Sequence, residues 1–434
     1  MNDKSLSSVY AKDKRCYSDW VGACIDAVSG SDVPLIFRKW AALSAIAAVL
    51  GRKCWYDQGE YKIRPNLFVV LVSPPNRGKS TSFNLPVEDV LHRLSTPIGS
   101  NSDSSWKKYI GPHNQPIHIV RDRLTTERLG QIMGKLCVPI LCSTEIESES
   151  ALTLLTDEFG TLVSRQDGNL QAFLTKAWDS RDFQEYHTKQ AGTDIIKGPY
   201  LNWLAGATPT TLLENMPKNA TKQGLLSRMI LVYFEGAKIP NKTRTKGRTR
   251  QEVEWLARDL GRIGNIEGEF DWESRSFELN VQEWLNAGAP PALDDVLPGA
   301  EEYNGRRFAH LVKIAICLSA SKRADRVIRE SDWEEAKEWL FEVEAFLPAL
   351  LQRFAFGEAG LMADELIEFI RKSGGVVRSS RLKQEALRRT HNSGEVDAIL
   401  KTMEDSGLIV KEEAKTPKGK TIYRIAEDES GQKG

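Results

Sequence analysis

Apolar and polar segments alternate along the chain in a pattern that predicts buried strands separated by helices. Short apolar runs bounded by turn residues are typical of strands that are covered on both faces. Four such runs stand out, and they comprise residues 67–72, 152–158, 201–207 and 229–234. Helical patterns lie between them. The chain is therefore predicted to be an α/β protein with a parallel sheet flanked by helices.

Weaker patterns predict the remaining elements. The expected helices cover residues 17–49, 83–94, 126–135, 170–179, 251–263, 305–322 and 331–354, the last with Ser331 as its N-cap. Short strands are expected at 117–120, 138–142 and 276–279, an acidic loop at 143–151, and a β-hairpin at 186–196 with Lys189 near its tip.

The C-terminal part has a different pattern from the rest of the chain. A Gly-containing stretch at 357–360 is the expected boundary, and three helices followed by two short strands are the order of a winged helix. The predicted organisation is a helical lead-in at 1–60, a P-loop ATPase core at 61–240, a linker and helical lid at 241–356, a winged helix at 357–426 and a disordered tail at 427–434.

The first apolar strand leads directly into a candidate phosphate-binding loop that ends in Gly78-Lys79-Ser80. Backbone N–H groups of such a loop bind polyphosphate, the lysine reaches the terminal phosphates and the hydroxyl binds Mg²⁺. Ser73 stands where this motif usually has its first glycine, and glycine there permits backbone angles that serine disfavours. The residues expected to bind the nucleotide are Ser73, Asn76, Arg77, Gly78, Lys79, Ser80 and Thr81.

A second motif closes the strand at 152–158, which ends in Asp157-Glu158. A carboxylate at a strand tip near a phosphate loop holds magnesium, and a second one orients the attacking water. Asp157 is therefore the expected metal ligand and Glu158 the expected catalytic base. A solvated acidic turn is the alternative for such a pair on its own.

Composition by itself indicates no particular class of partner. Lys+Arg and Asp+Glu both total 59, so overall charge indicates neither nucleic acid nor a membrane surface, and any basic surface is local. The six cysteines have no metal-ligand or disulfide spacing. No signal peptide or apolar span is evident, and we expect a soluble cytoplasmic protein.

The order of these motifs resembles AAA+ P-loop ATPases, and within them the minichromosome-maintenance helicases. LLTDEFG resembles their Asp-Glu box, and LAGATP resembles their polar strand tip, with Thr208 in place of asparagine. GLLSRMILV resembles their arginine-finger segment, which assigns Arg228. GRRFAHLVKIA is similar to their lid, with Arg306 as the better match and Arg307 as the second. The hairpin of Lys189 resembles their DNA-contacting pore hairpin, although their large N-terminal collar is absent.

The chain also looks like a family of phage and mobile-element P-loop ATPases with helicase-like features. These resemblances imply ATP and Mg²⁺ bound between subunits of a ring, most often a hexamer, that acts on single-stranded or forked DNA. Lys79, Ser80, Asp157, Glu158 and Thr208 would act from one subunit and Arg228 across the interface. A structural salt bridge is the alternative for Arg228, and an ordinary exposed lysine is the alternative for Lys189. The implied function is a DNA translocase or replicative helicase, and the alternatives are an ATP-dependent loader of a replication protein or a non-hydrolysing DNA-binding ring.

The predicted winged helix has an acidic third helix, which a phosphate surface would repel. Basic residues lie instead on its second helix and in its wing, and they are Arg381, Lys383, Arg388, Arg389, Lys418 and Lys420. We expect these residues to contact the nucleic-acid backbone or to dock on a partner protein, rather than to read bases.

Overall fold

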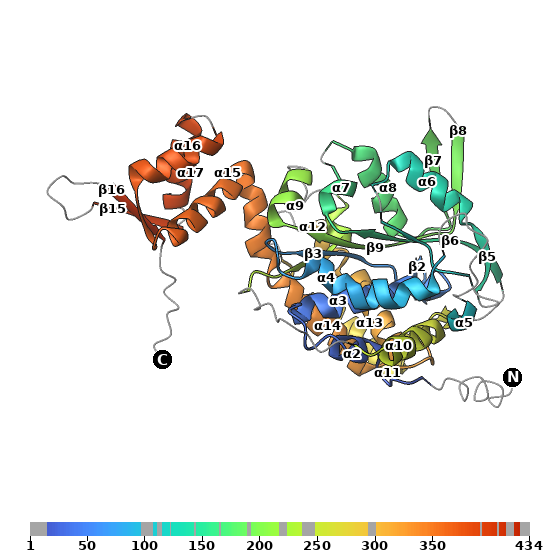
Figure 1. Ribbon diagram of the computed structural model, residues 1–434. Helices are drawn as coiled ribbons and strands as arrows, with labels where there is room; N and C mark the ends of the chain where they lie inside the picture. Colours follow the sequence, from blue (N-terminus) through green and yellow to red (C-terminus); the bar gives the residue numbers. More distant parts are fainter. Residues whose placement is uncertain are drawn as a thin grey trace. The chain divides into compact units, whose positions relative to one another are not determined.

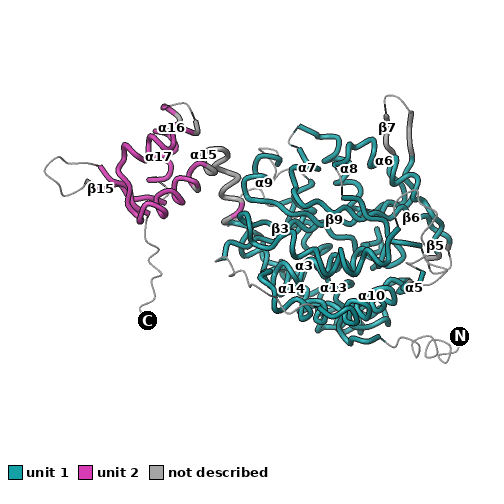
Figure 2. The backbone as a smooth tube through the Cα atoms, in the orientation of Figure 1, with its two compact units in different colours: residues 1–348 teal, residues 349–434 magenta. Residues whose placement is uncertain are grey.

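The structure, a computed structural model, divides into two compact units, residues 1–348 and 349–434 (Figure 2). It describes residues 15–96, 107–110, 115–121, 123–142, 145–164, 166–188, 192–216, 224–236, 248–293, 301–390, 393–405, 408–413 and 421–425. Both units have hydrophobic cores of their own. None of the described helices combines the length and the apolar character that crossing a membrane requires.

The first unit is built on a mostly parallel six-stranded sheet (Figure 1). Its strands are β3 (Phe68–Val72), β4 (Ile119–Val120), β5 (Val138–Cys142), β6 (Glu145–Thr156), β9 (Pro199–Ala207) and β10 (Ile230–Tyr233). Their order is β10-β3-β9-β6-β4, all paired in parallel, and β5 pairs antiparallel with β6. The predicted α/β class and the four predicted buried strands are confirmed.

Helices cover both faces of this sheet. α6 (Thr126–Lys135), α7 (Phe159–Leu162) and α8 (Gly168–Trp178) lie over one face, and α3 (Leu35–Leu50) lies against the other (Figure 1). Behind α3 pack α10 (Arg250–Ile263) and α13 (Arg307–Lys322). Thirteen of the sixteen residues of α3 are buried, because this helix is enclosed between the sheet and the outer helices.

The helix after the phosphate loop is irregular. α4 (Lys79–Phe83) continues into a π-helical segment, Asn84–Val90, and a 3₁₀ turn, Leu91–Leu94. Pro86 has no backbone N–H, so it cannot complete the i to i−4 bond that a regular helix needs at this position. The predicted helix at 83–94 is thus present, with a changed hydrogen-bond pattern.

The acidic loop predicted at 143–151 is wrong from Glu145 onward, since these residues belong to β6 and pair with β5. These acidic residues can form a strand because neighbouring cations neutralise the Glu147 carboxylate. Glu147 forms ion pairs with Arg64 at 3.0 Å and with Lys62, in β2 (Lys62–Ile63), at 2.9 Å. The carboxylate on the strand is thereby neutralised.

Two local predictions in the C-terminal half of this unit are also wrong. The strand expected at 276–279 lies in α11 (Arg275–Asn286), where the Ser274 hydroxyl accepts a hydrogen bond from Phe277 N at 3.1 Å and Val281 is buried one turn further on. α14 (Glu330–Glu344) begins before the expected N-cap Ser331. Asp332 accepts from Arg329 N at 3.1 Å, so the side chain in the first turn fixes the start of this helix.

The second unit packs helices against a small antiparallel sheet. α15 (Leu347–Lys372) runs without a break through 357–360, the expected boundary, and ends in this unit. It is followed by β14 (Val376–Arg378), α16 (Ser379–Thr390), α17 (Ser393–Asp405), β15 (Ile409–Glu413) and β16 (Thr421–Ile425). The sheet order is β14-β16-β15. The core contains side chains from each of these elements and from α15. The expected tail at 427–434 lies outside the described residues.

Candidate functional site

The phosphate loop follows β3 at the carboxyl edge of the sheet. Ser73 is fully buried, and its N–H donates to the carbonyl oxygen of Ala207 in β9 at 3.2 Å. The backbone takes left-handed angles at Asn76 (φ 60°) and Gly78 (φ 82°), but not at Ser73. The expected conflict between serine and the backbone of this loop is therefore absent, because the turn is made three and five residues later.

The ammonium of Lys79 is enclosed by this loop. It donates to the carbonyl oxygens of Ser73 at 2.7 Å and Pro74 at 3.1 Å, and to the Ser73 hydroxyl at 3.3 Å. Burial lowers the pKa of Lys79, and the negative charge of Glu158 partly opposes this shift. The lysine and the proposed catalytic base are therefore close enough to interact electrostatically.

The remaining loop residues differ in exposure. Asn76, Ser80 and Thr81 are exposed, so their polar groups are accessible to a ligand. Arg77 is different, since its Nε and Nη1 are buried and have no hydrogen-bond partner among the described residues. Buried guanidinium groups are normally paired, and an unpaired one beside a phosphate loop is suited to an anion.

The Asp-Glu pair lies at the same edge. β6 ends at Thr156, Asp157 is exposed, and Glu158 Oε1 is buried without a partner among the described residues. A Cβ atom placed on Gly206, in β9, would stand 2.7 Å from Asp157 O and 3.8 Å from Lys79 Cβ. The tips of the three adjacent strands β3, β9 and β6 thus bring the lysine and the acidic pair together.

Thr208, at the tip of β9, acts as the N-cap of α9 (Pro209–Asn215). Its hydroxyl accepts from Thr211 N at 3.0 Å and lies 2.8 Å from the Thr211 hydroxyl. β9 lies between β3 and β6, as the sequence predicted for the strand with a polar tip. The hydroxyl is consequently engaged in capping at the edge where the phosphate loop begins.

The residues at this edge fit a magnesium–triphosphate ligand. Three observations support the fit: the left-handed backbone at Asn76 and Gly78, the enclosed Lys79 ammonium, and the polar atoms of Arg77 and Glu158 that have no partner among the described residues. Ser80 and Asp157 are the oxygen ligands available to Mg²⁺, which also takes oxygens from phosphate and water. No group of three or more His, Cys, Asp or Glu side chains in the described part of the chain is arranged to hold a metal by itself.

Arg228 lies at the opposite edge of the sheet. It precedes β10, whose first residue Ile230 pairs with Val69 near the start of β3, whereas the phosphate loop follows the end of β3. The five residues of β3 separate the two levels by roughly 16 Å. Within one chain, Arg228 therefore does not face the phosphate loop.

The Arg228 guanidinium is paired inside its own chain. Its Nε and Nη2 donate to the two carboxylate oxygens of Asp179, each at 3.1 Å, and its Nη1 donates to Gly224 O at 2.7 Å. The structural salt bridge considered as the alternative role is thus present. Asp179 and its neighbour Trp178 were missed from the sequence, because nothing local at the end of a predicted helix indicates the arginine that will pack there.

The two lid arginines have different surroundings. Arg306 is partly exposed and its Nη1 lies 3.8 Å from Asp179 Oδ1. Arg307 is buried and donates to Glu344 Oε1 at 2.8 Å and to Pro291 O at 2.6 Å. Of the two, Arg306 is the one whose side chain is exposed enough to meet a ligand.

The candidate nucleic-acid residues are described only in part. Lys189, Lys418 and Lys420 lie outside the described residues, as does the side chain of Arg389. The hairpin expected around Lys189 is present as β7 (Phe183–Thr188) and β8 (Gly192–Lys197). In the second unit, the Arg381 guanidinium lies 5.5 Å from the centre of the Phe369 ring. Lys383 is paired with Asp397 at 2.7 Å, and Arg388 with Glu385 at 3.3 Å.

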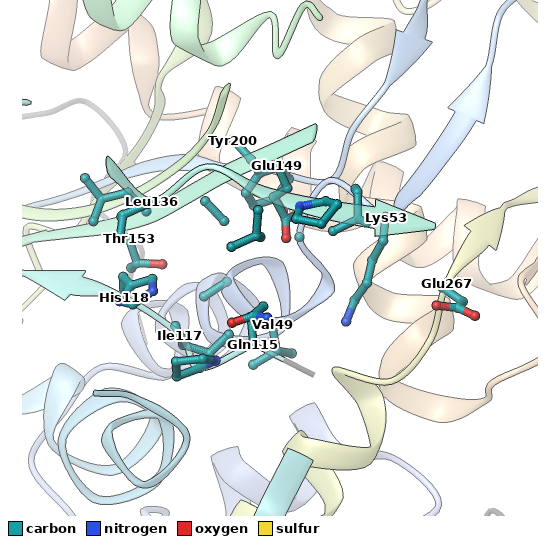
Figure 3. A pocket seen from close by; sticks show the side chains of 18 residues that line it. Val49, Lys53, Gln115, Ile117, His118, Leu136, Glu149, Thr153, Tyr200 and Glu267 are labelled. Carbon is teal, nitrogen blue, oxygen red and sulfur yellow. The ribbon is translucent and has the colours of Figure 1, made fainter. Parts of the chain in front are cut away.

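A cavity of about 280 Å³ lies apart from this site, beside the first part of β6 (Figure 3). The polar side chains of Lys53, Glu149 and His118 stand around it, and His118 Nδ1 is buried without a partner among the described residues. Glu149 accepts a hydrogen bond from Arg52 N. Asp157 and Glu158 follow the other end of β6, so this cavity is not part of the phosphate-loop site.

Comparison with known proteins gives no family assignment, since no family model and no curated protein matches the sequence.

Proposed function

We propose that this protein is a P-loop ATPase of the AAA+ type that works as a ring of identical subunits, most often a hexamer, and moves along DNA as a translocase or replicative helicase. The observation that supports it best is that Lys79 and the Asp157-Glu158 pair lie at one edge of the sheet, on either side of Gly206 in the polar-tipped strand β9. That strand order is what an additional-strand P-loop ATPase requires.

Each residue at this edge has a role in the proposal. Lys79 neutralises charge on the terminal phosphates, whose oxygens would replace the loop carbonyls that now hold its ammonium, and Glu158 orients and deprotonates the attacking water. Thr208 assists from the tip of β9. Mg²⁺, held by Ser80 and Asp157, would bridge phosphate oxygens and neutralise developing charge.

A second subunit completes this site in the proposal. Arg228 and Arg306 lie at the edge of the sheet opposite the phosphate loop, and an arginine there reaches a phosphate only when another copy supplies it. An arginine offered across an interface typically raises the rate of phosphoryl transfer by several orders of magnitude. Ring assembly would thus couple hydrolysis in one subunit to the position of its neighbour.

DNA contacts are proposed for two regions. The β7–β8 hairpin, with Lys189 at its tip, would follow the phosphate backbone through a central pore. The second unit, proposed to be a winged helix, would add backbone contacts through α16.

One observation favours the second candidate function, an ATP-dependent loader or remodeller of a replication protein. Lys383 on α16 is already paired with Asp397 on α17 at 2.7 Å, and Tyr423 donates to Glu404 on the same helix at 2.8 Å. A surface on which acidic side chains neutralise the cations is better suited to a protein partner than to phosphates.

ATPase activity with and without DNA tests the proposal. We expect hydrolysis stimulated by single-stranded or forked DNA, at least 100-fold slower in Glu158→Gln and unchanged in the control Glu214→Gln, an exposed carboxylate on α9. Equal rates in Glu158→Gln and wild type would exclude the proposed site.

A strand-separation assay then distinguishes a DNA helicase from an ATP-dependent loader. Unwinding of a forked substrate that falls in Lys189→Ala supports the pore hairpin, whereas ATPase activity without any unwinding supports the loader. The mass in solution with and without a non-hydrolysable ATP analogue tests assembly, and a monomer in both conditions would leave Arg228 and Arg306 without a neighbouring triphosphate.

A further inference from the structure

Three cations converge on one carboxylate and one indole ring at the edge of the sheet where β3 begins. We call Trp178, Asp179, Arg228, Arg306 and Lys313 the cation seat. Asp179 binds Arg228 through two hydrogen bonds of 3.1 Å and lies 3.8 Å from Arg306. The Trp178 ring centre lies 4.0 Å from Lys313 Nζ, 5.6 Å from the Arg228 guanidinium and 6.0 Å from that of Arg306.

Charge in the seat is not balanced. Among the described ion pairs, Asp179 is the only carboxylate within 4.0 Å of any of the three cations. Lys313 donates instead to neutral oxygens of Asn66, at 2.6 and 3.1 Å. Burial, with a contribution from the neighbouring arginines, lowers the pKa of Lys313 to about 7. One carboxylate for up to three positive charges leaves an excess that an anion would neutralise.

The seat opens into a cavity of about 970 Å³, which Trp178, Asp179, Arg306 and Lys313 line together with further charged residues of both signs. The two arginines of the cation seat differ in exposure, since the Arg228 side chain is 6% exposed and the Arg306 side chain 39%. Trp178 is buried, and its Nε1–H has no acceptor among the described residues. An indole N–H without an acceptor, and an arginine over the same ring that is partly exposed, leave donors that an anionic oxygen could satisfy.

The phosphate loop of the same chain cannot supply that anion, because it lies at the other edge of the sheet. We infer that Asp179 is a positioning residue that anchors Arg228 and holds Arg306 at the mouth of this cavity. In that position, Arg306 meets a phosphate group bound to a second copy of the chain. This inference rests on the proposed ATPase function and adds to it a division of labour: Arg306 contacts the phosphate, and Arg228 fixes Asp179 from behind.

The contacts account for this division. Asp179 accepts hydrogen bonds from Nε and Nη2 of Arg228, and Gly224 O accepts one from Nη1. The Arg228 guanidinium is therefore held on two sides. Among the described residues, Arg306 has the 3.8 Å contact with Asp179 and a cation–π contact with Trp178, both weak enough to yield to a phosphate oxygen. Arg306 can therefore turn toward a ligand while Asp179 and Arg228 stay in place.

ATP-analogue binding and ATPase rate, measured in the same preparations, test the inference. We expect Asp179→Asn and Arg306→Ala to bind a fluorescent ATP analogue as wild type does, and to hydrolyse ATP at least tenfold more slowly. The matched control is Asp182→Asn, a carboxylate of the same cavity that is 87% exposed and pairs with Arg52. Its rate should equal that of wild type.

Mixing experiments separate positioning from a merely structural role. Asp179→Asn keeps its phosphate loop, and Lys79→Met keeps its seat, so the mixture of these two slow variants should regain activity at the interfaces that combine the intact halves. Asp179→Glu should restore part of the rate, because the negative charge returns. A rate in Asp179→Asn equal to that in Asp182→Asn, or a mixture no faster than its components, would overturn the inference.

Arg306→Ala removes no buried ion pair, so this variant is expected to fold even if Asp179→Asn does not. Full ATPase activity in Arg306→Ala would also overturn the inference. Failure of the proposed function looks different, since wild type would then neither bind the analogue nor hydrolyse ATP.

Discussion

The Lys79 ammonium donates to the carbonyl oxygen of Ser73 at 2.7 Å, across the loop that joins the two residues. The loop is therefore closed over its own lysine, in the position where phosphate oxygens would replace these carbonyl acceptors. Charge-assisted hydrogen bonds to phosphate are stronger than those to a neutral carbonyl, so ligand binding is expected to draw the ammonium outward.

Lys79→Met should weaken ATP binding at least tenfold, about 1.4 kcal/mol, because the methionine keeps the apolar stem and removes the charge. The matched control is Lys39→Met, a partly buried lysine that pairs with Glu342 at 3.0 Å. Titration with a fluorescent ATP analogue measures both. Equal affinity in the two variants would mean that the lysine does not contact the nucleotide.

Gly78→Ala should weaken nucleotide binding, whereas Gly288→Ala should not. Both glycines have nearly the same left-handed backbone, φ 82° and 81°, so the conformational strain of alanine, about 1 kcal/mol, is common to both. Only at Gly78 would the new Cβ press on backbone, 3.3 Å from Val33 Cα. Thermal unfolding measures the loss of stability that both variants share, and binding of an ATP analogue measures the loss of affinity expected in Gly78→Ala alone. Intact binding in Gly78→Ala would show that contact with the segment before α3 does not shape the loop.

Arg307→Ala should lower the free energy of unfolding by about 3–5 kcal/mol, because it leaves the buried Glu344 carboxylate without its cation. Arg306→Ala should cost less than about 1 kcal/mol, since its ion pair with Asp179 is long and partly exposed. Urea unfolding of the two variants measures the contrast. A large loss in Arg306→Ala would indicate that this arginine is structural and would weaken its assignment to the ligand.

Lys313 should make stability depend on pH in the alkaline range. Burial lowers its pKa from 10.5 to about 7. Between these values the unfolded chain holds a proton on this amine that the folded chain does not. Raising the pH therefore favours the folded state, by up to about 1.4 kcal/mol per pH unit.

The melting temperatures of wild type and Lys313→Met, measured from pH 7.5 to 9.5, test this pH dependence. The variant has no amine at this position and therefore lacks the contribution of Lys313 to it. We expect the difference between wild type and variant to change in favour of wild type as the pH rises. A constant difference would show that the folded chain keeps Lys313 protonated.

The parallel sheet and the two motifs at its carboxyl edge were predictable from the sequence. Apolar runs bounded by turn residues require burial on both faces, and Gly78-Lys79-Ser80 and Asp157-Glu158 each directly follow such a run. Parallel strands bring such tips to one edge whatever lies between them. Local predictions were wrong where a tertiary contact outweighs the structural preference of the local sequence. Glu147 is an example, because its ion pairs with Lys62 and Arg64 stabilise a strand where an acidic loop was expected.

Only the tertiary structure decided what happens at the other edge. Trp178, Asp179, Arg228, Arg306 and Lys313 are spread over 136 positions of the chain, and no pattern links them. The same holds for the roles of Arg306 and Arg307, which are adjacent and chemically identical in the sequence but face a cavity and a buried carboxylate respectively. Periodicity and motifs report what a residue's neighbours in the chain require. Ion pairing and exposure depend on groups that folding brings together from distant segments, so they are settled only when the chain has packed.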